Sequence, residues 1–205
     1  SNQVQIPDSI TSSIESLNVN AEISDLLRLL CSEIIKFQNA DLAQFYLEII
    51  EEAVKSSTRI NDQGKSDKLI QSIVKNVYKL IAYKDEYEVA RLFLSPEIAD
   101  EVKNLPQSTG KATWHFQPPF LRSMGLKRKL KLPFALAIPI MKILSRGKFL
   151  RGTRFDPFGY AEVRKVERLI RDRYIEEILG ALQNLSTDSY PQILQMSNLP
   201  ESVRG

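Results

Sequence analysis

Apolar residues recur three and four positions apart along the first part of the chain, and this period constrains the fold more than any other feature. Over residues 23–37 the spacing places one continuous apolar stripe on a helix, and residues 42–54 repeat the pattern. Two such helices joined by a few residues are typical of a helical hairpin, which we predict over 22–57. Ser24 or Asp25 is the expected cap of the first helix.

The remaining segments extend the helical interpretation to most of the chain. Apolar periods predict a long helix over 67–94 and another over 157–184. Between them, Gly and Pro residues interrupt the stretch 102–155, in which the aromatic-rich segment 111–117 favours a short strand. We therefore predict a mostly α-helical single domain over 1–205, with a small β or irregular element in the middle.

The scarcity of cysteine and histidine excludes several classes of protein. Cys31 is the only Cys and His115 the only His among 205 residues. A disulfide scaffold and a zinc site built from Cys and His are therefore excluded. The longest apolar run, Leu132–Met141, carries two prolines and is too short to span a membrane. With one Cys and no signal segment, the composition indicates a cytoplasmic protein.

No motif of a familiar active site is present. The sequence has no GxGxxG, no GxxxxGK[ST] and no HExxH, and we assign no catalytic or metal-binding residue. Lys84 and Glu88 lie four residues apart and are expected to pair on one helix face. Cys31 lies within a helical apolar period and is expected in the core. The first residue is Ser1, which we expect of a piece of a longer polypeptide.

Positive charge is concentrated in the middle of the chain. Residues 102–155 carry twelve Lys and Arg and no Asp or Glu, although the whole chain has a net charge of only +3. A basic stretch of this kind is either a solvated loop docked on acidic neighbours or a site for a small anion or a cofactor phosphate. DNA or RNA is not favoured, because no nucleic-acid-binding motif is present. The candidate anion-binding residues are Lys127, Arg128, Lys148, Arg151 and Arg154.

The segment 147–159 (GKFLRGTRFDPFG) combines glycines and cations before a predicted helix start. Backbone amides at a helix N-terminus and Arg side chains suit a phosphate or carboxylate ligand. The alternative is a buried structural network in which Asp156 pairs with Arg151 or Arg154. This alternative is favoured, because Asp156 itself occupies the position of the helix cap.

Several unusual strings occur together in the chain. They are KLIAYKDEYEVARL (79–92), HFQPPFLR (115–122), FLRGTRFDPFG (149–159), ERLIRDRY (167–174) and LPESVRG (199–205). In this order they resemble the C-terminal domain of fused indolepyruvate ferredoxin oxidoreductases, which belong to the 2-oxoacid:ferredoxin oxidoreductases. The earlier segment 34–54 is similar to the first helical hairpin of that domain. Within the strings, the candidate residues of a structural motif are His115, Asp85, Glu86, Asp156 and Gly159.

The resemblance implies a parent enzyme that decarboxylates indolepyruvate or another 2-oxoacid to an acyl-CoA and reduces ferredoxin. It also implies thiamine diphosphate and [4Fe–4S] clusters in upstream domains of the same polypeptide. No cofactor is expected in this chain, since one Cys cannot supply the four thiolates of a cluster. We expect the isolated chain to be inactive and to serve as a structural or CoA-phosphate-binding accessory domain. The alternative is an independent nucleic-acid or regulatory binding module that uses the basic centre.

Overall fold

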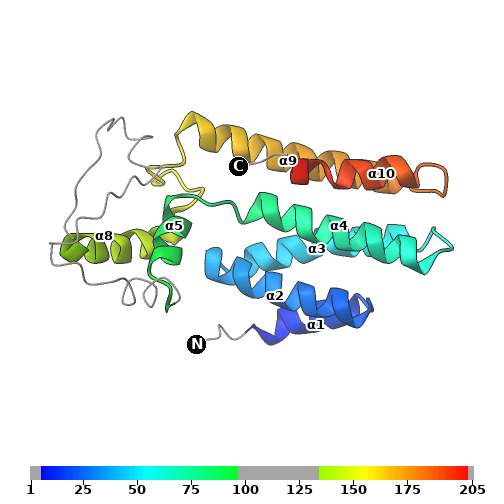
Figure 1. Ribbon diagram of the computed structural model, residues 1–205, viewed down its shortest axis with the longest axis horizontal. Helices are drawn as coiled ribbons and strands as arrows, with labels where there is room; N and C mark the ends of the chain where they lie inside the picture. The colour runs from blue at the N-terminus through cyan, green and yellow to red at the C-terminus, as the bar shows by residue number, and fades with distance from the viewer. Residues whose placement is uncertain (1–5, 97–133, 203–205) are drawn as a thin grey trace, which may run out of the picture. The chain divides into compact units, whose positions relative to one another are not determined.

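The computed structural model describes residues 6–96 and 134–202, with side chains described from residue 138 onward in the second range. In these ranges the chain forms nine α-helices, one short 3-10 helix and no strand (Figure 1), which confirms the predicted mostly α-helical fold. The predicted strand over 111–117 lies outside the described residues. The elements are α1 (Asp8–Ser16), α2 (Ala21–Phe37), α3 (Ala40–Ser57), α4 (Gln63–Ile81), α5 (Glu86–Phe93), α8 (Phe134–Arg146), η1 (Gly147–Leu150), α9 (Glu162–Gln183), α10 (Tyr190–Ser197) and α11 (Leu199–Ser202).

The chain divides into two compact units. The first contains residues 1–82 and 166–205, and the second contains residues 83–165. One boundary falls at the break between α4 and α5, and the other falls within α9. Each unit has its own apolar cluster. No helix in the described ranges is long and apolar enough to cross a lipid bilayer.

The first unit is a bundle in which α2, α3 and α4 lie side by side (Figure 1). The apolar stripes read from the sequence form its core, with Leu27, Ile50 and Ile73 fully buried. Burying one such side chain contributes roughly 1.5–3 kcal/mol. Cys31 is also fully buried in this core. The Tyr46 hydroxyl avoids the cost of burial by donating to the Val74 carbonyl oxygen at 2.9 Å.

Short polar side chains begin the three central helices. The side-chain oxygens of Asn20, Asn39 and Asp62 accept the backbone N–H groups that open α2, α3 and α4, at 2.9, 3.0 and 3.1 Å. Each cap residue has extended backbone angles, as an N-cap requires. The prediction that Ser24 or Asp25 caps the first helix is wrong, since Asn20 starts that helix earlier.

Two predicted helices have different bounds in the structure. The single helix predicted over 67–94 is two helices, α4 and α5, because Asp85 takes an extended conformation and caps a new helix. The helix predicted over 157–184 begins only at Glu162, as the chain turns through residues 156–159 first. In both places a buried aspartate side chain accepts hydrogen bonds from backbone amides two or three residues further on, which favours a cap or a turn over a continuous helix.

Hydrogen bonds hold the C-terminal helices in place within the first unit. Arg59 donates to the carbonyl oxygens of Leu182 and Gln183 at 2.9 and 2.8 Å, where the last carbonyls of α9 have no helical partner. The Tyr174 hydroxyl donates to the Ser197 carbonyl oxygen at 2.8 Å. The Arg59 bonds connect positions more than a hundred residues apart in the sequence. The Tyr174 bond holds the end of α10 beside α9.

The second unit is smaller and contains α5, α8 and η1. Helices α5 and α8 pack against each other around Ala90 and Met141, which are buried. Phe93, Leu144 and Phe158 surround this pair and are partly buried. This small apolar cluster adjoins a much larger group of buried charges, which forms the candidate site.

Candidate functional site

The second unit contains a cluster of buried charged residues around the start of α5. Asp85, Glu86, Glu88, Arg151 and Asp156 are each at most 8% exposed. Charged side chains are rarely buried to this extent unless they are paired. We call this group, with Tyr87, Arg91, Lys148 and Arg164, the charge cluster.

Asp85 has two roles in the cluster. One carboxylate oxygen caps α5 by accepting the Glu88 N–H at 2.8 Å. The Arg151 guanidinium binds both carboxylate oxygens, with Nη2 at 2.9 Å from Oδ1 and Nε on Oδ2. The side chains are only 4% and 5% exposed. Such a two-pronged pair is strong and fixes the relative orientation of its partners. It therefore ties the start of α5 to the segment that follows η1.

Asp156 makes a second connection between the same two segments. The Tyr87 hydroxyl donates to its Oδ1 at 2.9 Å, while the N–H groups of Phe158 and Gly152 donate to its two oxygens at 3.1 Å each. Burial raises the pKa of Tyr87, and the hydrogen bond to Asp156 raises it further. The tyrosine is therefore a neutral donor, and three donors compensate the buried carboxylate.

Three glycines make this packing possible. A Cβ at Gly147 would lie 2.9 Å from the Tyr87 ring, and one at Gly159 would lie 2.7 Å from Oδ2 of Asp156. Gly152 has a φ of +76°, which L side chains rarely adopt. The glycines of the GKFLRGTRFDPFG segment thus allow close approach of neighbouring side chains and a left-handed turn.

Two further ion pairs complete the cluster. Arg91 binds Glu88 within α5, with donor–acceptor distances of 2.6 and 2.9 Å. Arg164 Nη2 lies 3.2 Å from both carboxylate oxygens of Glu86, but the geometry allows a hydrogen bond to Oε1 only. Oε2 of Glu86 is thus buried close to positive charge without a hydrogen bond.

The charges of the cluster balance. Four carboxylates face four basic side chains, the last of which is Lys148 beside Arg151 and Arg91. Burial lowers the pKa of Lys148, and the two guanidinium groups lower it further. Because its acidic and basic side chains bind one another, the cluster is suited to hold the surrounding segments together. Among the described residues, no group of His, Cys, Asp and Glu is arranged to hold a metal ion.

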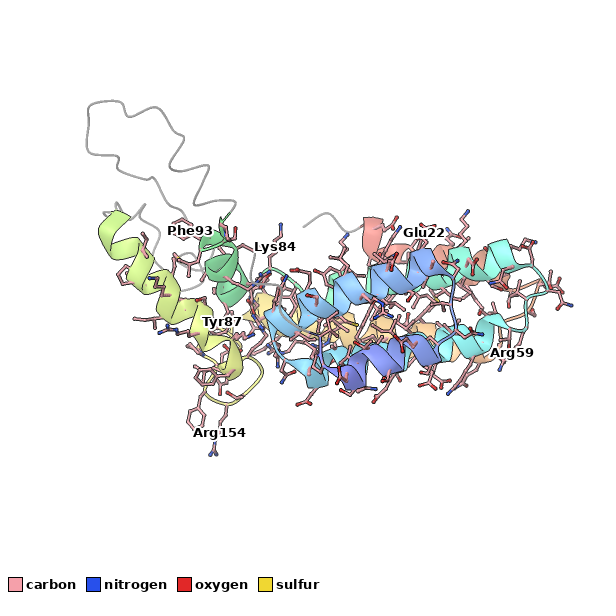
Figure 2. The ribbon with its side chains drawn as sticks, turned by 90° about the horizontal axis from the view of Figure 1, so that it is seen from below. Glu22, Arg59, Lys84, Tyr87, Phe93 and Arg154 are labelled. Carbon is pink, nitrogen blue, oxygen red and sulfur yellow. The ribbon has the colours of Figure 1, made fainter. Side chains whose placement is uncertain are left out.

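The structure describes three of the five basic residues that the sequence grouped as an anion site, namely Lys148, Arg151 and Arg154. Arg151 is buried on Asp85, and Lys148 is partly buried near it. Arg154 is exposed and extends away from the fold (Figure 2), with its guanidinium carbon 5.1 Å from the centre of the Phe155 ring. The partner of Arg151 is Asp85, so the expectation that Asp156 pairs with Arg151 or Arg154 is wrong.

The predicted structural motif is brought together in large part. Asp85, Glu86, Asp156 and Gly159 all belong to or adjoin the charge cluster. Lys84 is exposed ahead of α5 (Figure 2), and Glu88 pairs with Arg91, which corrects the expected Lys84–Glu88 pair. His115, Lys127 and Arg128 lie outside the described residues.

Sequence reasoning missed Tyr87 and Arg164 as partners in the cluster. One local signal was available, because Asp85 and Glu88 are spaced as a capping box requires. That spacing predicts a helix start at residue 86 and a side chain of Asp85 turned toward the backbone. The long-range partners have no such signal, since they lie 66 to 78 residues away.

Comparison with known protein families gives one match. Residues 23–205 match a family of unknown function, DUF6537. The match covers the first unit from residue 23 onward, the whole second unit and all segments of the charge cluster. No curated protein and no solved structure matches the chain.

Proposed function

This chain belongs to the DUF6537 family, and we propose that it is a non-catalytic accessory domain of a cytoplasmic 2-oxoacid:ferredoxin oxidoreductase that acts on indolepyruvate or a related 2-oxoacid. The catalytic body supplies thiamine diphosphate, [4Fe–4S] clusters and the sites for CoA and ferredoxin. The role of this domain is to stabilise the assembly. Its charge cluster holds the second unit in one conformation, and its basic surface faces the body or an anion such as the phosphates of CoA.

One observation carries the proposal. Two of the strings that resemble the oxidoreductase family, residues 79–92 and 149–159, are the two segments that the charge cluster joins. Asp85 and Tyr87 come from the first string, and Arg151 and Asp156 come from the second. The unusual residues of both strings thus bind each other, which supports a structural role for them in a domain of that family.

The bonding of the cluster favours a structural role over catalysis. Asp85 and Asp156 each accept three hydrogen bonds from the protein, so neither carboxylate is placed as a general base or a nucleophile. Tyr87 is buried, with its hydroxyl proton directed to Asp156. These groups hold a turn and a helix together, and redox chemistry in the parent enzyme is left to the upstream domains.

The assay uses the natural polypeptide that contains this chain. We expect it to reduce ferredoxin, or a viologen dye in its place, when given indolepyruvate and CoA. The 205-residue chain alone is expected to turn over none of these substrates. Absence of 2-oxoacid oxidation by the natural polypeptide, with a panel of aryl and alkyl 2-oxoacids, would reject the proposal.

Two titrations of the chain separate the possible anionic ligands. Saturable binding of CoA that Arg154→Ala weakens would assign the phosphate role to the exposed loop. Tight binding of duplex or single-stranded oligonucleotides with a steep salt dependence would instead favour a nucleic-acid-binding module. Weak, unsaturable binding in both titrations is the result expected of a domain that packs on protein.

A further inference from the structure

We draw no further inference here: the strongest candidate, the exposed apolar stripe of Val163, Val166 and Ile170 along the first half of α9, carries none, because nothing in the described part of the chain shows what covers it.

Discussion

Replacing Arg151 with methionine removes the guanidinium that binds both carboxylate oxygens of Asp85. The side chains are 5% and 4% exposed, so water cannot replace the lost partner. Breaking a buried ion pair from one side costs about 3–5 kcal/mol, because the other charge is left buried and unpaired. The cap that Asp85 provides to α5 is retained in this variant, so the loss reports on the ion pair.

A double-mutant cycle separates the ion pair from the cap. Asp85→Asn keeps a side-chain oxygen for the Glu88 N–H but leaves the Arg151 charge buried, so we expect a loss of similar size. The double variant Asp85→Asn with Arg151→Met leaves no unpaired charge. It should cost no more than either single variant, so that the coupling energy between the two sites is at least about 3 kcal/mol.

The assay must distinguish the two compact units. Urea unfolding followed by circular dichroism gives the free energy of unfolding of each variant, and hydrogen exchange of the peptide covering α5 locates the change. In both single variants exchange should rise in α5 more than in α3, which belongs to the first unit. An Arg151→Met variant as stable as the parent, or single losses that simply add in the double variant, would refute the reasoning.

Three further predictions concern close packing and buried hydroxyl and thiol groups. Gly159→Ala places a methyl group against the Asp156 carboxylate and should lower the free energy of unfolding by about 1–3 kcal/mol in urea or thermal unfolding. Gly180→Ala, in a helix with nothing within 4 Å of the new Cβ, should raise it by about 0.5–1 kcal/mol. Tyr87→Phe removes a donor from Asp156 and should cost about 1.5–3 kcal/mol in the same assay; no loss would show that the bond is not formed in solution. Burial raises the pKa of the Cys31 thiol from 9.0 to about 12, so the folded chain keeps its proton where the unfolded chain loses it. The resulting contribution to the free energy of unfolding is complete below pH 9 and is lost as the pH rises toward about 12. Over this range the free energy of unfolding should fall by up to about 1.4 kcal/mol per pH unit more steeply than in Cys31→Ala. Equal pH slopes in the two proteins would contradict a buried, protonated thiol.

The helical character of the chain and the first bundle follow from local sequence. Over residues 23–54, apolar residues recur every three or four positions, as in an amphipathic helix. Short polar residues, Asn20 and Asn39, lie where the helices begin. Both signals act within a few residues, so they are visible without a structure. The same reasoning predicted a single helix over 67–94, because the apolar period continues across the break. The cap that begins α5 depends on one side chain, that of Asp85.

The partners within the charge cluster were decided by tertiary structure alone. The sequence indicated an Arg–Asp network in residues 147–159 but matched Asp156 with a neighbouring Arg. In the folded chain Arg151 binds Asp85, 66 residues away, and Asp156 binds Tyr87, 69 residues away. Sequence spacing carries no information on which charges meet at such separations. Their choice depends on which partners can be buried together with all their hydrogen bonds satisfied, and this is a property of the packed fold.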